Sequence, residues 1–452
     1  MTRVLFISAE PLGPSMAGPA IRVLELARAV AAHCEVTVAA PGPSDAGDAP
    51  IELLEAQLAD FDTLLEAIKR HDVVVAQRLP PQLLRNVAKL PVRFVADLYN
   101  PQMIEVLEAA GQDGAGSSPR RAWRSMLGQC AVADLVICAS EKQRDLWLGG
   151  MGLAGLIDVE RYRADPTFRS YVDVVPFGLP DRPPERSQPV LKGVWPGIDA
   201  NDHVLLWAGG VWRWLDAITP IRAVERLRSG GRRVHLVFLG VGRPQLKGGT
   251  VPSSADEAVA FAAERGLEGT CVHFNRGWVP YAERQAYLLE SDIGVCAHQD
   301  HLEARFSFRT RVLDHFWAGL PSVVSGGDAI GDLVDRRGLG RAVAPGDDED
   351  FALACAQLLD DPAAHAAAAG RVRELAPSLR WSEVARPLVR FCRELDSRPA
   401  REPARSALTR ATYGQYPDIL ADLRERGGLG AVARRVPHHV ARLLRHLSLI
   451  HI

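Results

Sequence analysis

Short apolar runs, rich in valine, leucine and isoleucine, alternate with longer amphipathic segments along most of the chain. In the first part, these runs predict strands at residues 4–8, 35–39, 73–76, 92–96, 135–138 and 172–175. The pattern then restarts and predicts strands at residues 203–208, 234–240, 271–275, 293–297, 322–325 and 341–344. Between the first two runs, residues 20–33 carry apolar side chains at helical spacing. Such alternation is typical of parallel sheets with right-handed crossovers, so the sequence predicts two α/β domains in tandem.

A break rich in proline and charged residues, at 179–189, separates the two patterns. The expected parts of the chain are a Rossmann-like domain at 1–180, a linker at 181–190, a second Rossmann-like domain at 191–377, a closing helix at 378–398 and a basic amphipathic tail at 399–452. Doubly wound sheets bind ligands beyond the carboxyl ends of their strands. We therefore expect the two domains to face each other across a ligand-binding cleft.

The composition narrows the class of protein. Hydrophobic residues make up 47% and charged residues 24% of the chain, as in soluble globular proteins. A net charge of −2 argues against nucleic acid as a partner. The seven cysteines are scattered without a C-x-x-C pair, which favours reduced thiols in the cytoplasm over disulfides or a metal site. No apolar run approaches the length of a membrane-spanning helix.

The tail differs in charge from the rest of the chain. From Arg401 onward it holds nine arginines against four acidic residues, an excess of five positive charges. Near its end, Val440, Leu443, Leu444 and Leu447 form one apolar helical face. A basic amphipathic helix of this kind lies on an anionic membrane or docks on the protein body, and the pattern leaves both open.

Two features of the first domain suggest a ligand site. The first turn between strand and helix is rich in glycine and proline, and Gly18 would let a ligand approach the backbone where Arg22 adds charge. The turn is not a G-x-G-x-x-G fingerprint, so it gives little support for a dinucleotide. Asp97, which ends a predicted strand, either points into the cleft or caps the following turn.

In the second domain, the loop after the first strand reads GGVWRWLD. Gly209 and Gly210 allow close approach to a phosphate or a sugar, and the indoles of Trp212 and Trp214 suit stacking on a base or sugar ring. A second loop, NRGWVP at 275–280, could frame a base and contributes Trp278 and Val279. Tryptophans are also common in protein cores, so each loop alone is a moderate signal.

The segment at 301–325, HLEARFSFRTRVLDHFWAGLPSVVS, carries the strongest signal. It contains a predicted helix with an apolar stripe, and before or at the start of this helix lie Glu303, Arg309 and Arg311. The start of a helix favours anions, because its backbone N–H groups are unpaired and its dipole is positive there. The segment therefore predicts a phosphate site. The sequence has no H-E-x-x-H, G-x-S-x-G or Walker loop, which argues against a zincin, an α/β-hydrolase and a P-loop enzyme.

Taken together, these segments resemble the retaining, nucleotide-sugar-dependent glycosyltransferases of the GT-B fold, of the family-4 type. The likeness covers roughly residues 1–396. It rests on the opening strand, loop and helix, on VVPFG at 174–178, on GGVWRWLD, on FNRGWVPYAERQAYLLESDIGV and above all on SFRTRVLDHFWAGLPSVVS. The resemblance implies that the first domain binds the acceptor and the second binds the nucleotide sugar.

Members of this family typically carry two glutamates eight positions apart, the second of them five residues before the glycine of G-x-P. Here Gly319 and Pro321 place the second on Asp314, which the resemblance implies binds the donor ribose. The first falls on Phe306, so that glutamate is missing. Glu303, three residues earlier, is expected to take its place near the donor sugar.

The lysine that usually follows the glycine-rich strand end also has no clear match. The resemblance therefore implies that Arg309 and Arg311 supply the positive charge for the diphosphate, and we expect them to be catalytic together with Asp97 and Glu303. Phe308 comes directly before Arg309, and Thr310 lies between the two arginines. Both are further expected donor contacts.

The function implied by the resemblance is transfer of a sugar, with retention, from a nucleotide-diphosphate sugar to a hydroxyl of a glycan or lipid-linked glycan, as in cell-surface polysaccharide biosynthesis. It implies no metal and no cofactor beyond the donor. A cytoplasmic protein at the inner face of the membrane would fit the basic tail. Two alternatives stay open: a nucleotide-sugar 2-epimerase of the same fold, and a catalytically silent nucleotide-sugar-binding protein.

Overall fold

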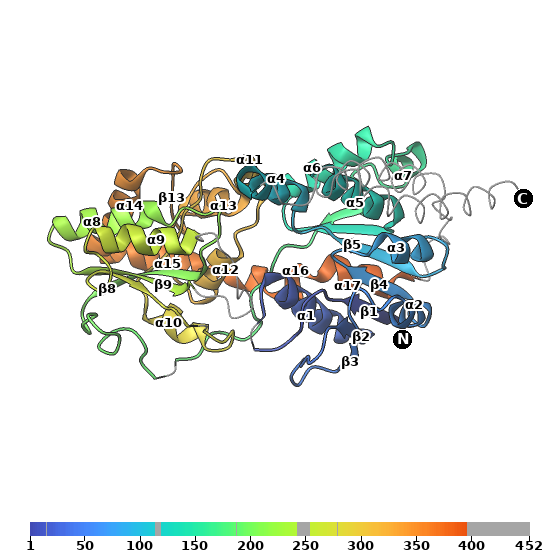
Figure 1. The fold of residues 1–452 in the computed structure, drawn as a ribbon, viewed down its shortest axis with the longest axis horizontal. Coiled ribbons are helices and arrows are strands. Elements are labelled where there is room, and N and C mark those ends of the chain that lie inside the picture. Colours follow the sequence, from blue (N-terminus) through green and yellow to red (C-terminus); the bar gives the residue numbers. More distant parts are fainter. Residues whose placement is uncertain (15, 114–118, 187, 242–253, 278, 396–452) are drawn as a thin grey trace, which may run out of the picture.

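The computed structural model describes residues 1–395, apart from residues 15, 114–118, 187, 242–253 and 278. Over these residues the chain forms two α/β domains side by side, each built on one parallel sheet (Figure 1). The predicted fold class of two doubly wound domains in tandem is confirmed. The basic tail and Trp278, for which the sequence makes predictions, lie outside the described residues.

The first sheet has the strand order β3-β2-β1-β4-β5-β6-β7. Its strands are β1 (Arg3–Ile7), β2 (Glu35–Ala40), β3 (Ile51–Glu55), β4 (Val73–Ala76), β5 (Arg93–Asp97), β6 (Leu135–Cys138) and β7 (Val172–Val174). The central strands are buried almost throughout, because helices cover both faces of a parallel sheet. The sequence pattern does not predict β3, an edge strand of mostly exposed or half-buried residues in which glutamate interrupts the apolar run.

The second sheet has the order β10-β9-β8-β11-β12-β13. Its strands are β8 (His203–Gly210), β9 (Val234–Gly240), β10 (Val272–Phe274), β11 (Ile293–Cys296), β12 (Ser322–Ser325) and β13 (Gly340–Val343). In both sheets the strand order reverses beside the first strand of the domain. This is the switch point where the fold leaves a crevice for ligands at the carboxyl ends of the strands.

Helices connect the strands in both domains. In the first domain they are α1 (Gly18–Ala31), α2 (Phe61–Lys69), α3 (Pro81–Val87), α4 (Gln102–Asp113), α5 (Pro119–Val132), α6 (Glu141–Leu153) and α7 (Val159–Ala164). In the second they are α8 (Ile218–Ser229), α9 (Ser254–Glu264), α10 (Arg284–Glu290), α11 (Leu302–Phe306), α12 (Thr310–Trp317), α13 (Ala329–Arg337), α14 (Asp348–Asp360) and α15 (Pro362–Leu375).

The last described elements return to the first domain. They are the 3-10 helix η1 (Ala376–Leu379), α16 (Trp381–Val384) and α17 (Arg386–Arg393). Both α16 and α17 pack on α1 (Figure 1). The Trp381 ring lies 5.0 Å from that of Phe177. The expected single closing helix is thus two short ones. Pro387, in the first turn of α17, explains the break, because proline cannot continue the hydrogen bonding of α16.

The chain crosses between the domains at two places that are bonded to each other. Leu179 N donates to Leu379 O at 2.7 Å, and Trp381 N donates to Leu179 O at 2.9 Å. The crossings therefore form a short two-stranded ribbon. Within the described residues, no helix combines the length and the apolar character that crossing a membrane requires.

Candidate functional site: the cleft between the two sheets

The glycine-rich end of β8 leaves room for a neighbouring cation. Gly209 has a φ of +137°, a conformation that strains any residue with a side chain. A Cβ at this position would lie 3.9 Å from the guanidinium carbon of Arg311. That guanidinium also lies 4.9 Å from the centre of the buried Trp207 ring, a cation–π arrangement. The predicted residues Gly209 and Arg311 are therefore neighbours.

Arg311 is a positive charge for which the described residues supply no ion-pair partner. Within the described residues it makes no ion pair, and its Nη1 atom is buried without a hydrogen-bond partner. Burial, reinforced by the nearby charge of Arg309, lowers the pKa of Arg311. Arg311 is the second residue of α12, whose first turn receives no hydrogen bond from a capping side chain. The cation thus lies at the positive end of a helix dipole, which is a favourable arrangement for an anion.

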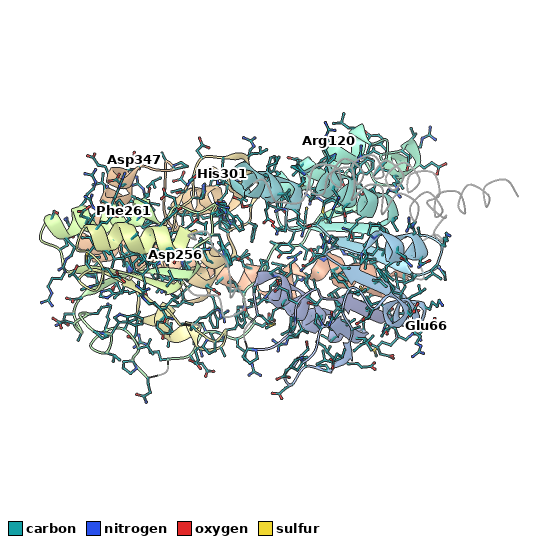
Figure 2. The ribbon with its side chains drawn as sticks, in the orientation of Figure 1. Glu66, Arg120, Asp256, Phe261, His301 and Asp347 are labelled. Carbon is teal, nitrogen blue, oxygen red and sulfur yellow. The ribbon has the colours of Figure 1, made fainter. Side chains whose placement is uncertain are left out.

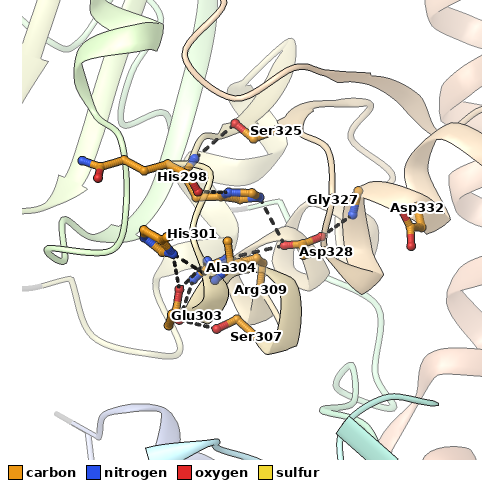
Figure 3. A network of polar contacts seen from close by, with 12 residues as sticks. His298, His301, Glu303, Ala304, Ser307, Arg309, Ser325, Gly327, Asp328 and Asp332 are labelled. Atoms are coloured by element: carbon orange, nitrogen blue, oxygen red, sulfur yellow. Dashed lines mark hydrogen bonds and ion pairs between the residues drawn. The ribbon is translucent and has the colours of Figure 1, made fainter. Parts of the chain in front are cut away.

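Arg309 has a different environment, although it is only two residues away (Figure 3). Its Nη2 lies 2.8 Å from Glu303 Oε2 and its Nε lies 3.5 Å from Asp328 Oδ2. All three side chains are at least 94% buried. Burial opposes the charge of Arg309, but the two carboxylates outweigh it and raise the pKa of Arg309. The predicted pair Glu303 and Arg309 thus forms an internal ion pair, in which Ser307 also donates to Glu303.

Two histidines flank this ion pair. His301 caps α11, because its Nδ1 accepts a hydrogen bond from Ala304 N at 3.1 Å, and it lies where the second domain approaches the first (Figure 2). His298 lies 3.7 Å from Asp328, too far for a hydrogen bond. Burial and the charge of Arg309 lower the pKa of His298, and burial raises that of Asp328. Among the described residues, the Nε2 atoms of both histidines are buried and have no hydrogen-bond partner.

The predicted ribose ligand, Asp314, lies further along α12. Arg284 Nε donates to Asp314 Oδ1 at 3.0 Å, and the Arg284 guanidinium stacks between the rings of Tyr281 at 3.6 Å and Trp317 at 4.6 Å. Asp314 keeps 25% of its side chain exposed. The Nη1 atom of Arg284 donates to Tyr281 O, whereas Nη2 is buried and has no hydrogen-bond partner within the described part of the chain. Sequence reasoning missed Arg284, which lies thirty positions from Asp314 on another helix.

The loop after β8 presents two stacked indoles. The rings of Trp212 and Trp214 are 5.9 Å apart and inclined by 18°. Gly210 lies against Trp212, since a Cβ there would be 3.3 Å from the indole. Asp216 ends this loop as the cap of α8, accepting from Ile218 N and Thr219 N at 3.0 Å each. Its carboxylate is therefore occupied.

The remaining predicted donor contacts are spread around this region. Thr310 is the first residue of α12 and Phe308 precedes it, half-buried against the core. Val279 packs on a small cluster that contains Leu191 and Leu320 rather than on the β8 loop. The structure thus brings Gly209, Gly210, Thr310 and Arg311 toward one strand end. In the described part of the chain, no group of three or more His, Cys, Asp or Glu side chains is arranged to hold a metal ion.

In the first domain, Asp97 is the counter-ion of Arg22. Arg22 is fully buried, and its Nε and Nη2 donate to both Asp97 oxygens at 2.8–3.0 Å. It also donates to Val175 O and stacks 4.8 Å from the Tyr99 ring. Asp97, 3% exposed, is therefore turned into the domain rather than into the cleft. Gly18, at the start of α1, faces open space, since an added Cβ would meet nothing within 4 Å.

Direct contacts join the two domains. Gln143 Nε2 donates to Tyr99 O at 2.7 Å in the first domain and to Phe306 O at 2.8 Å in the second. Lys142 pairs with Asp332 at 2.7 Å. The side chain of Phe306 packs on the core of the first domain. The position where the resemblance places a glutamate is thus an apolar interdomain contact.

Comparison with known proteins identifies the class. Residues 202–361 match the family model described as "Glycosyl transferases group 1". A search of curated protein sequences gave no match. Among solved structures, sucrose-phosphate synthase from Thermosynechococcus elongatus is similar, with 16% identity and a TM-score of 0.61 over 88% of this chain and 100% of that one.

Two further structures show the same architecture. HepE of Anabaena, solved with UDP-glucose, has 16% identity and a TM-score of 0.61 over 88% of this chain and 100% of that one. WaaG, a glycosyltransferase involved in lipopolysaccharide biosynthesis, has 17% identity and a TM-score of 0.57 over 86% of this chain and 99% of that one. At these identities the structures show the fold.

The two-domain architecture and the family match together define the class of protein: the chain has the GT-B fold of glycosyltransferases, and its second domain matches the group 1 glycosyl transferases over residues 202–361.

Proposed function

We propose that this glycosyltransferase takes its sugar from a nucleoside-diphosphate sugar, a UDP-sugar in the first instance, and transfers it with retention to a hydroxyl of a glycan or lipid-linked glycan. The observation that carries the donor site is Arg311, a cation without an ion-pair partner in the described part of the chain. It lies beside Gly209 at the uncapped start of α12. The similar protein HepE was solved with UDP-glucose, which supports the choice of UDP.

In this reading, the diphosphate occupies the space between the end of β8 and the start of α12. The Arg311 guanidinium and the first backbone N–H groups of α12 neutralise the charge that develops when the sugar leaves. Gly209, whose φ of +137° strains any residue with a side chain, would present its bare backbone to the phosphate. A cation that is already in place costs no reorganisation during the reaction. One such contact is worth roughly 2–4 kcal/mol at the transition state.

Asp314 would accept hydrogen bonds from the ribose hydroxyls, with Arg284 holding its carboxylate in position. The stacked pair of Trp212 and Trp214 offers a flat apolar surface to a sugar or base ring. Glu303 and Arg309 neutralise each other, so they would shape the pocket for the donor sugar more than they would add net charge.

A binding panel tests this proposal. UDP, GDP, ADP and UDP-glucose are each added to the full chain, and the unfolding midpoint is measured. A nucleotide at a hundred times its Kd stabilises the protein by about 2.7 kcal/mol, so UDP should raise the midpoint of the wild type but not of Arg311→Gln. Arg305→Gln is the matched control, because Arg305 is exposed on the neighbouring α11. Unchanged midpoints with every nucleotide would contradict the proposal.

Incubation with UDP-glucose alone separates the transferase from its alternatives. Slow hydrolysis to UDP and glucose supports a transferase, because water can replace the acceptor. Inversion at C2 of the sugar would indicate an epimerase, and binding without turnover a silent binding protein. The missing glutamate at Phe306 makes these controls necessary.

We further propose that the enzyme acts in cell-surface polysaccharide biosynthesis at the cytoplasmic face of the membrane. The excess of positive charge in residues 399–452 supports this placement, since basic segments are attracted to anionic lipid.

A further inference from the structure

One carboxyl group of the first domain lies opposite the donor-side segment and is not part of the site described so far. Glu105 is in the first turn of α4, and Asn100 Nδ2 donates to its Oε2 at 3.1 Å. Across the domain boundary, α4 contacts α11 (Figure 1). Glu105 thus lies where the first domain contacts α11 of the second, within electrostatic reach of Glu303.

The interdomain amide of Gln143 fixes this arrangement. By donating to Tyr99 O and to Phe306 O, it holds the loop that leads into α4 against the end of α11. Asn100, which contacts Glu105, follows Tyr99 directly, and Glu303 lies one helical turn before Phe306. Glu105 and the donor-side segment are therefore neighbours across the domain boundary.

The groups that face Glu105 keep its carboxyl poised between its two protonation states. Burial has the largest effect, and together with the negative charge of Glu303 it raises the pKa of Glu105 to about 7. The hydrogen bond from Asn100 and the positive charge of Arg309 oppose this rise. Burial raises the pKa of Tyr99 far above neutrality, and the negative charge of Glu105 acts in the same direction, so the Tyr99 phenol stays protonated. Glu303, by contrast, is paired with a cation.

We propose that Glu105 is the base that accepts the proton of the acceptor hydroxyl. This inference rests on the proposed transfer from a nucleoside-diphosphate sugar. The acceptor oxygen forms a bond to the anomeric carbon, and the bond from that carbon to the diphosphate oxygen breaks with its electron pair going to the diphosphate. The proton of the hydroxyl moves to a carboxylate oxygen of Glu105, which releases it to water when the products leave. When water replaces the acceptor, Glu105 accepts the proton of the water.

The test uses UDP-glucose hydrolysis by the full chain, followed from pH 5 to pH 9. The wild-type rate should fall on the acidic side with a midpoint near the pKa of Glu105, about 7. Glu105→Gln keeps size and shape and should reduce the rate by about 100-fold or more, because a positioned base contributes roughly 10²- to 10⁴-fold. Its UDP affinity, measured by calorimetry, should match that of the wild type.

Asn100→Ala separates proton transfer from a structural role. It removes a hydrogen bond that favours the charged form, so the acidic midpoint should move to higher pH while the rate at pH 9 changes little. Glu160→Gln, which alters an exposed glutamate on α7, should leave the profile unchanged. If Asn100→Ala leaves the midpoint in place, or if Glu105→Gln keeps the acidic limb, the assignment of the base is overturned.

A second measurement does not depend on turnover. In protein with ¹³C-labelled glutamate carboxyls, the resonance that is missing from Glu105→Gln should titrate near pH 7, and a midpoint below pH 5 would overturn the inference. A different result would refute the proposed donor, namely a wild type that neither binds UDP nor cleaves UDP-glucose. A wild type that cleaves UDP-glucose with no dependence on Glu105 refutes this inference alone.

Discussion

Arg309 and Arg311 lie two positions apart at the start of α12. Replacing Arg309 with glutamine should mainly lower stability, whereas replacing Arg311 with glutamine should mainly lower turnover. Arg309→Gln leaves the carboxylates of Glu303 and Asp328 buried without their cation. Removing one partner of a buried ion pair costs about 3–5 kcal/mol of stability. For a domain of this size, each kcal/mol lowers the unfolding midpoint by roughly 2–4 °C, so we expect a loss of about 6–20 °C.

Arg311→Gln removes a cation that has no ion-pair partner in the described part of the chain. Its stability should therefore change by about 1 kcal/mol or less, as is usual for changes that break no buried network. The loss should instead appear in turnover. A contact worth roughly 2–4 kcal/mol at the transition state corresponds to a fall of about 30- to 1000-fold in rate.

The assay compares unfolding midpoints with UDP-glucose hydrolysis for Arg309→Gln, Arg311→Gln and the exposed control Arg305→Gln. The control should match the wild type in both measurements. Full activity of Arg311→Gln would refute the diphosphate role of that residue. A midpoint of Arg309→Gln within 2 °C of the wild type would show that its ion pair contributes far less to stability than roughly 3 kcal/mol.

Three other perturbations have defined outcomes. Asp314→Asn should weaken UDP binding by about 10-fold in calorimetry, because it removes an anionic acceptor and the partner of Arg284, while undiminished affinity would argue against the ribose contact. Burial and the neighbouring His235 lower the pKa of His273 to about 4, below its unfolded value of about 6.5. The stability that depends on neutral His273 is therefore fully present above pH 6.5, and the free energy of unfolding should fall by about 2 kcal/mol from pH 7 to pH 5. Urea unfolding measures this loss, and a midpoint that does not change with pH would disprove it. Deleting residues 437–452 should reduce sedimentation with anionic liposomes, and equal binding to neutral vesicles at high salt would count against an electrostatic tether.

The strands could be predicted from the sequence because parallel strands buried on both faces are continuous apolar runs, as in β4 and β6. The edge strand β3 was not predicted in the same way, because all of its residues are exposed or half-buried and its sequence is no continuous apolar run. Helix spacing explains why Arg309 and Arg311 have different neighbours. Residues two positions apart at a helix start point to nearly opposite sides, so Arg309 turns toward Glu303 and Arg311 toward Gly209.

The pairing of charges was the part of the site that the linear pattern could not supply. Asp97 was expected to face the cleft, but its partner Arg22 lies 75 positions away and turns it inward. Arg284 lies 30 positions from Asp314 on another helix. Each of these pairs forms only when helices pack against the ends of strands, and the spacing of residues in the sequence does not predict that packing. Glu105 likewise becomes notable only when α11 of the other domain packs against it.

The ribbon made by Leu179 and Leu379 has a consequence for how this enzyme can be dissected. Because the chain leaves the first domain near Leu179 and returns beside it, α16 and α17 complete a domain whose other elements are encoded some two hundred residues earlier. A fragment ending in the segment before β8 would lack Trp381 and leave Phe177 and the adjoining side of α1 uncovered. The first domain should therefore be produced as an internal-deletion variant, in which a short linker joins Leu179 directly to η1 and the last helices.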